Sequence, residues 1–105
     1  MGAIEILRII HFDRRRRVLG IAEYRGDAER VVMPMREIIG EALRLGSAGL
    51  LLSHNHPSGD PTPSRADIAA THQLGRVIEA LGMTLHDHLV IGTNRRVSFR
   101  ALGLL

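Results

Sequence analysis

The sequence predicts an α/β domain of the α+β type, in which a mixed β-sheet is flanked by helices. Segments typical of strands are interrupted by two stretches with helical spacing, so the expected order is β-β-β-α-β-α-β-β. The 105 residues are enough for one hydrophobic core and too few for two. Hydrophobic residues make up 45% of the chain and aromatic residues only 3%, so this core must be aliphatic.

The first third of the chain is expected to consist of strands. Residues 4–12 are rich in β-branched and other apolar side chains, which is typical of a strand. A turn at residues 13–16 leads into a second strand over residues 17–24, so the two segments should form a hairpin. Residues 25–27 interrupt this pattern, and residues 29–33 are expected to form a short third strand.

Two helices are expected, one on each side of a buried strand. Pro34 suits the first position of a helix, whose apolar residues recur at helical spacing until a natural stop at Gly46. Residues 47–53 contain an apolar run typical of a strand buried on both faces. After a loop, Ser64 can cap a second helix that ends at Gly82. The apolar stripe of this helix consists of Ala70, Leu74, Val77, Ile78 and Leu81.

The last part of the chain is expected to complete the sheet. Residues 83–91 read as a strand, residues 93–95 as a turn and residues 96–99 as a last short strand. Neither an internal repeat nor a linker separates the elements. A single domain over residues 1–105 is therefore expected.

The composition limits the chemistry and the compartment. The absence of cysteine excludes disulfides, thiol catalysis and thiolate zinc sites, and it is compatible with a reducing compartment. Neither a signal pattern nor an apolar run of about 18 residues is present, so a cytoplasmic protein without a membrane partner is expected. The net charge of only +3 permits a nucleic-acid partner without arguing for one.

Residues 53–67 have the layout of a metal site built where a buried strand ends and a helix begins. His54 and His56 are two apart at the strand end, so both imidazoles can face one ion. Ser64 and Asp67 lie at i and i+3, on one face of the first helical turn. Two histidines and a carboxylate leave a position for water, as in a catalytic zinc site. The competing interpretation is two surface histidines and an aspartate that only complements the helix dipole.

The same residues allow one other metal chemistry and exclude another. Two histidines and a carboxylate also describe the facial triad of non-haem iron oxygenases. Zinc deaminase chemistry is excluded, because those sites need cysteine ligands. A second His-x-His pair, His86 and His88, is followed by neither Ser nor Asp at a useful spacing. This second pair is more readily explained as support for the sheet or the lining of a cleft than as a metal site.

The spacing around the first pair resembles the JAMM signature of the JAB/MPN metalloprotease superfamily. The matching pattern here is His54-x-His56, followed after seven residues by Ser64 and after two more by Asp67. Three segments resemble the RadC-like branch, namely residues 54–61 (HNHPSGDP), 34–37 (PMRE) and 87–92 (DHLVIG). The resemblance covers essentially the whole chain.

The resemblance implies a fold and a domain organisation. The fold would be a curved mixed sheet flanked by helices, a JAB/MPN domain related to the cytidine deaminases. Full-length RadC-like proteins carry a helix-hairpin-helix domain in front of this one, and no such domain is found in residues 1–105.

The resemblance also implies a zinc-dependent metallopeptidase or isopeptidase. The implied zinc ligands are His54, His56 and Asp67. Ser64 would help to stabilise the oxyanion of the tetrahedral intermediate. The general base of the family is a glutamate near the start of the first strand, here Glu5, with Glu23 and Glu37 as competing candidates. Zinc lowers the pKa of a bound water to about 7, and the base would take its proton and deliver it to the leaving amine.

An alternative function is that of a DNA-repair-associated accessory domain whose metal site is structural or inactive. The feature that supports it is the charge run at the first turn, formed by Arg14, Arg15, Arg16 and Arg17. On a hairpin turn such arginines are most simply solvated, and the sharper interpretation is a contact with phosphate or an acidic partner. The substrate of the peptidase, a peptide or an isopeptide, is not identified by the sequence.

Overall fold

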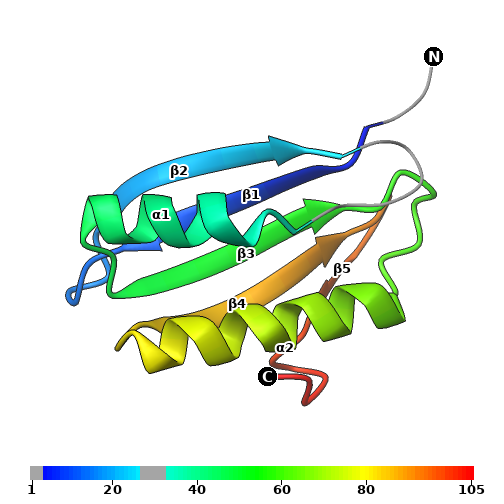
Figure 1. Ribbon diagram of the computed structural model, residues 1–105. Coiled ribbons are helices and arrows are strands. Elements are labelled where there is room, and N and C mark those ends of the chain that lie inside the picture. The colour runs from blue at the N-terminus through cyan, green and yellow to red at the C-terminus, as the bar shows by residue number, and fades with distance from the viewer. Residues whose placement is uncertain (1–3, 27–32) are drawn as a thin grey trace.

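The computed structural model describes residues 4–26 and 33–105, which form five strands and two helices (Figure 1). The strands are β1 (Ile6–Phe12), β2 (Val18–Arg25), β3 (Gly49–Asn55), β4 (Thr84–Ile91) and β5 (Arg96–Ser98). The helices are α1 (Met35–Leu45) and α2 (Arg65–Ala80). A mixed sheet flanked by two helices confirms the predicted fold class. Apart from Met33, the strand expected over residues 29–33 lies outside the described residues.

The sheet has the strand order β2-β1-β3-β4-β5, so β3 lies at its centre. Only the β3–β4 pair is parallel; the other three pairs are antiparallel. Antiparallel neighbours can be joined by a tight turn, as β1 and β2 are, whereas parallel neighbours need a crossover. Helix α2 supplies that crossover, and its start therefore lies beside the end of β3 (Figure 1).

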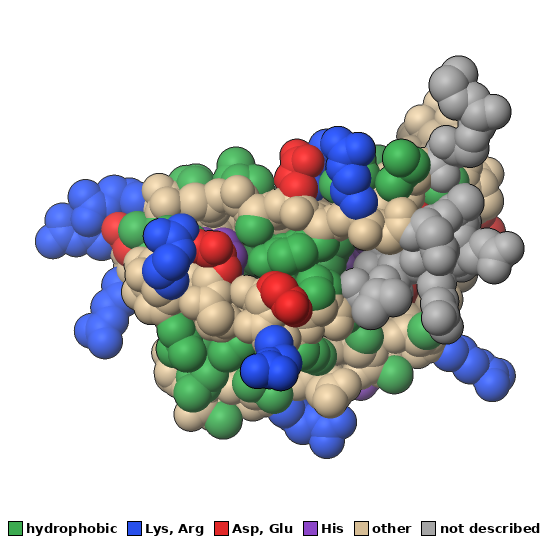
Figure 2. Space-filling model, turned by 45° about the horizontal axis from the view of Figure 1, so that its top comes forward, with side chains coloured by type: hydrophobic (Ala, Val, Ile, Leu, Met, Phe, Trp, Pro, Cys, Tyr) green, Lys and Arg blue, Asp and Glu red, His purple; other side chains and the backbone are tan. Residues whose placement is uncertain are grey.

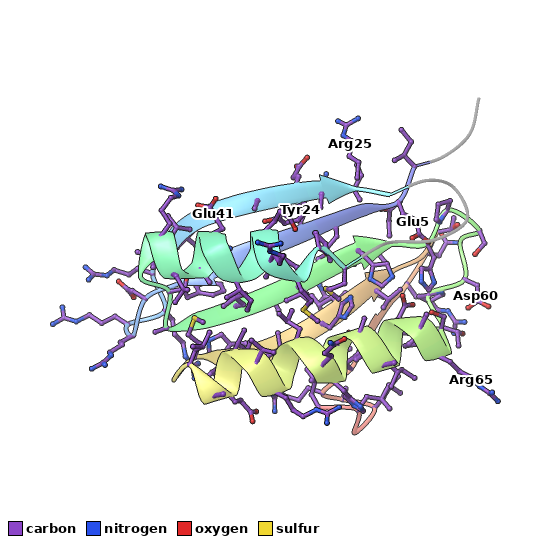
Figure 3. All side chains as sticks on the ribbon, viewed as in Figure 1. Glu5, Tyr24, Arg25, Glu41, Asp60 and Arg65 are labelled. Carbon is purple, nitrogen blue, oxygen red and sulfur yellow. The ribbon has the colours of Figure 1, made fainter. Side chains whose placement is uncertain are left out.

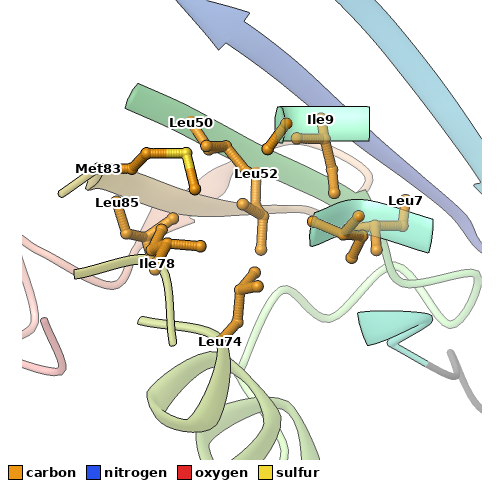
Figure 4. Close-up of a cluster of buried hydrophobic side chains, with 10 residues drawn as sticks. Leu7, Ile9, Leu50, Leu52, Leu74, Ile78, Met83 and Leu85 are labelled. Carbon is orange, nitrogen blue, oxygen red and sulfur yellow. The ribbon is translucent and has the colours of Figure 1, made fainter. Parts of the chain in front are cut away.

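Both helices pack on one face of the sheet. Residues two apart on a strand share a face, and the buried residues of β1 and β3 alternate in this way. The core cluster consists of Leu7, Ile9, Ile38, Ala42, Leu50, Leu52, Leu74, Ile78, Met83 and Leu85. Figure 4 shows side chains from strands and helices meeting in this cluster. The core is aliphatic, as the composition predicts.

The ends of the helices follow from local chemistry. Pro34 is the N-cap of α1 rather than its first helical residue, and Gly46 ends the helix in the left-handed conformation with φ 67°. Ser64 is the N-cap of α2, as predicted. Gly82, which the sequence marks as the stop, follows the helix end with φ 80°. Within the described residues, neither helix is both long and apolar enough to span a membrane.

Candidate metal centre

The end of β3 places two histidines on the face of the sheet that the helices cover. His54 pairs with Leu7 of the core and is 2% exposed. His56 follows the strand, and its backbone N–H donates to the Ile91 carbonyl at 2.9 Å, which extends the contact with β4. The two imidazole centroids are 4.8 Å apart. The two-residue spacing therefore brings both rings to one point.

Asn55, between the histidines, ties the start of β1 to the end of β3. Its Oδ1 accepts a hydrogen bond from the Ile6 backbone N–H at 2.7 Å, and its Nδ2 donates to the Ile4 carbonyl at 3.0 Å. The side chain thus continues the ladder between the two strands beyond their last backbone pair. It fixes the position of the chain just before β1, where Glu5 lies.

The loop after His56 is held against β4 and the segment that follows it. Gly59 has φ 88°, a conformation that favours glycine, and its carbonyl accepts the Thr93 backbone N–H at 3.0 Å. A Cβ atom at Gly92 would overlap the Gly59 carbonyl oxygen, so the close approach requires glycine there. The Asp60 side chain accepts hydrogen bonds from the backbone and hydroxyl of Thr62. These contacts give the proline-rich spacer one shape.

A capping box at the start of α2 holds Asp67. The Ser64 hydroxyl oxygen accepts the Asp67 backbone N–H at 3.0 Å, and Asp67 Oδ2 accepts the Ser64 backbone N–H at 2.9 Å. Burial alone would raise the pKa of the Asp67 carboxyl. The nearby His54 ring and the hydrogen bonds from Ser64 outweigh burial and hold that pKa well below its usual range. The side chain is therefore a carboxylate at neutral pH.

Three potential ligand atoms converge between the end of β3 and the start of α2. One atom each from His54, His56 and Asp67 lies within 4.8 Å of the others. Asp67 Oδ2 is 3.1 Å from His56 Nε2 and 3.6 Å from His54 Nε2. The structure thus brings together the three residues that the sequence predicts as ligands.

The hydrogen bonds around this group leave one ring nitrogen of each histidine facing its centre. His56 Nδ1 lies 2.8 Å from the Asp60 carbonyl oxygen, which can only accept, so Nδ1 carries a proton. His56 Nε2, the other ring nitrogen, lies 3.1 Å from Asp67 Oδ2 and faces the centre of the group. His54 Nε2 is buried and has no hydrogen-bond partner. Two imidazole nitrogens and a carboxylate oxygen form a donor set that fits a divalent metal ion.

His54 is supported from behind by residues of β4 and α2. Its Nδ1 lies 2.6 Å from His88 Nε2, and His88 Nδ1 lies 2.8 Å from Thr71 Oγ1. Burial, followed by the neighbouring His54, lowers the pKa of His88 to about 3. His88 thus backs one of the grouped histidines, while His86 packs against Phe12. Sequence reasoning did not identify Thr71, although it lies one helical turn after Asp67.

The three candidate glutamates lie in different places. Glu5 is 8% exposed, and counting back from the Leu7–His54 pair puts it beside His56 on the helix-covered face. Figure 3 places Glu5 at the same end of the sheet as the loop that carries Asp60. Glu23 lies on the opposite face, where it forms an ion pair with Arg8 at 3.0 Å. Glu37 is exposed in the first turn of α1.

The arginine-rich turn lies at the other end of the sheet (Figure 1). Asp13 organises it by accepting hydrogen bonds from the backbone N–H groups of Arg15 and Arg17. Figure 2 shows basic side chains projecting from this end of the molecule. A pocket next to the turn is lined by Arg14, Arg15 and Arg17. The turn is therefore remote from the grouped histidines.

Comparisons with known proteins agree with this geometry. The family described as "RadC-like JAB domain" matches residues 2–104. A UPF0758 protein of Rhodobacter capsulatus is 51% identical over 102 residues, which cover 96% of this chain and 48% of the relative. A UPF0758 protein of Ruegeria pomeroyi is 46% identical over 102 residues, which cover 96% of this chain and 46% of the relative. The chain spans about half the length of these relatives.

Proposed function

The chain belongs to the RadC-like JAB domain family, and from that premise we propose that it is a zinc-dependent metallopeptidase or isopeptidase. The observation that carries the proposal is the convergence of His54 Nε2, His56 Nε2 and Asp67 Oδ2. In this proposal the three residues hold zinc, and the reaction is hydrolysis of an amide bond. Zinc bound there would polarise the substrate carbonyl and lower the pKa of a bound water to about 7.

Glu5 is proposed as the general base. It lies on the same face as the two histidines and is nearly buried, whereas Glu23 and Glu37 face away or are exposed. A carboxylate in this position can accept a proton from the attacking water and deliver it to the leaving amine. Asn55 holds the backbone on both sides of Glu5, through the Ile4 carbonyl and the Ile6 N–H.

Ser64 is proposed as the donor to the oxygen that becomes negative during attack. Its capping bond uses the hydroxyl oxygen as an acceptor and leaves the hydroxyl hydrogen available. The residue is exposed at the N-terminal end of α2, where the helix dipole favours negative charge. A donor of this kind contributes typically about 100-fold to 1,000-fold to the rate.

The decisive experiment combines zinc stoichiometry with cleavage of an unbiased peptide library. We expect Glu5→Gln to bind one zinc ion per chain with unchanged affinity and to lose hydrolysis. His56→Ala should lose both, because it removes a ligand. Glu23→Gln and Glu37→Gln are matched controls and should cleave at the wild-type rate. Full turnover by Glu5→Gln would contradict the assignment of the base, and wild-type protein that binds iron but not zinc would contradict the metal.

A further inference from the structure

We propose that His88 and Thr71 are positioning residues that hold the proton of His54 on Nδ1 and thereby keep His54 Nε2 available to a metal ion. The inference rests on the proposed metal centre and adds two residues to it. Neither residue is in the group of potential ligands.

The Asp67 carbonyl fixes the first proton. Thr71 Oγ1 lies 2.7 Å from this oxygen, which has no hydrogen to donate. Thr71 must therefore donate its single hydroxyl hydrogen to it. If Thr71 donated to His88 instead, two oxygen atoms would face each other with no hydrogen between them. The Thr71 oxygen is then an acceptor toward its other neighbour, His88 Nδ1, at 2.8 Å. His88 consequently carries a proton on Nδ1.

His88 in turn fixes the proton of His54. His88 is 1% exposed, and a cation in such a place would lose its hydration, so the ring is neutral. With its proton on Nδ1, His88 Nε2 is an acceptor. His54 Nδ1, 2.6 Å away, must then be the donor. With Nδ1 donating, Nε2 is the ring nitrogen of His54 that remains for a metal ion, and it is the buried atom without a hydrogen-bond partner.

Packing prevents the His88 ring from turning out of this chain. Its ring stacks on Phe99, with centroids 4.5 Å apart and planes at 21°. Its backbone N–H donates to the Asp87 side chain at 2.7 Å, and its carbonyl accepts the Phe99 backbone N–H at 3.0 Å. Phe99 is itself fully buried. The ring therefore holds its two nitrogens between His54 and Thr71.

His54 and His56 both carry a proton on Nδ1, but different partners hold that proton. The more exposed His56 donates directly to the carbonyl of Asp60 in the loop. His54 is buried between the sheet and the helices, and its Nδ1 is linked to the Asp67 carbonyl through His88 and Thr71. Outer partners of metal-bound histidines commonly fix the tautomer in this way, and their loss typically weakens metal binding by about 10-fold to 100-fold.

Thr71→Val tests the chain without touching a ligand side chain. Valine has nearly the same shape and fills the buried site, but it cannot accept from His88 Nδ1. With no acceptor left for its Nδ1 proton, His88 is more stable with the proton on Nε2. His88 Nε2 then donates to His54 Nδ1, so His54 must carry its own proton on Nε2. We expect zinc affinity to fall by about 10-fold to 100-fold. Thr71→Ser keeps the hydroxyl and should bind zinc as the wild type does, and Thr84→Val is a matched exposed control.

Two measurements read the result independently of activity. Zinc affinity is measured by competition with a chelator, and the tautomers of His54 and His88 are read from nitrogen-15 NMR of the zinc-free protein at neutral pH. We expect both rings to carry their proton on Nδ1 in the wild type and in Thr71→Ser. The His54 proton should move to Nε2 in Thr71→Val.

The outcomes separate this inference from the proposed function. Wild-type protein that binds no zinc but has the expected tautomers would contradict the metal centre and leave the chain of protons standing. If Thr71→Val kept wild-type zinc affinity and an unchanged His54 tautomer, the roles of His88 and Thr71 would be wrong and the metal centre would be unaffected. If Thr71→Val does not fold, the wild-type spectrum decides, because a proton on His54 Nε2 there would overturn the inference.

Discussion

Replacing Ser64 with alanine separates the two roles of its side chain, as helix cap and as proposed hydrogen-bond donor. The capping bond to the Asp67 N–H is 3.0 Å long, and loss of such a bond costs typically about 1 kcal/mol. For a domain of this size that corresponds to a fall in Tm of roughly 4 °C. The Ser64 backbone N–H still reaches Asp67 Oδ2 at 2.9 Å, so zinc affinity should stay close to that of the wild type.

Two further variants separate the loss of the helix cap from the loss of the hydrogen-bond donor. Ser64→Asn retains a capping oxygen and should restore the Tm, but it has no hydroxyl to offer the substrate. Ser64→Thr retains both groups. We expect hydrolysis to fall by about 100-fold to 1,000-fold in the alanine and asparagine variants and to persist in Ser64→Thr.

Thermal unfolding followed by circular dichroism, together with zinc titration and peptide cleavage, measures all three quantities on the same samples. An alanine variant that melts with the wild type would refute the energetic role of the cap. An asparagine variant that retains full hydrolysis would refute the role of the hydroxyl. A large loss of zinc affinity in Ser64→Ala would show that the backbone contact does not hold Asp67 by itself.

Four further outcomes are expected. Zinc at about 100 times its Kd should stabilise the folded protein by about 2.7 kcal/mol, and His56→Ala should abolish this rise in Tm. Leu74→Ala, which empties a fully buried position, should cost about 2–5 kcal/mol in urea unfolding, whereas Val77→Ala on the same helix, 39% exposed in the wild type, should cost much less. Burial alone would raise the pKa of Asp87, but its hydrogen bonds, led by that from the Ser98 hydroxyl, hold it below the usual 3.8. Its ionised form is therefore the stabilising one, so stability should be lost as the pH falls below 3.8, and Asp87→Asn should flatten that loss in urea unfolding measured from pH 7 to pH 3. If the arginine turn binds nucleic acid, neutralising its four arginines should weaken binding and reduce its salt dependence, and binding that is absent or independent of salt would refute that role.

The elements with strong local signals were predictable from the sequence. The cap at Ser64 and the stop at Gly46 depend on neighbours close in the chain, and the structure places both as expected. The strand expected over residues 47–53 is present but runs from Gly49 to Asn55, so it includes His54. Strand spacing and helical spacing together brought His54 and His56 to Asp67. Local chemistry was sufficient here because the loop between them is short and stiff.

The surroundings of the site were not predictable in the same way. His88 meets His54 only because β4 lies parallel to β3, and that pairing is made by the α2 crossover rather than by any local pattern. The choice among the three glutamates likewise needed the register of β1, since a shift of one residue would exchange Glu5 for a residue of the opposite face. Long-range pairing leaves little trace in one sequence.

In the proposed centre Asp67 Oδ2 would serve both the helix start and the ion, so opening of the first turn of α2 would be coupled to release of the ion. If that turn opened, the Ser64 N–H would leave this oxygen and the carboxylate would move away with the chain. His54 on β3 and His56 directly after it belong to the other side of the site and would stay in place. Hydrogen exchange at the Asp67 amide would then report how often the ion can leave.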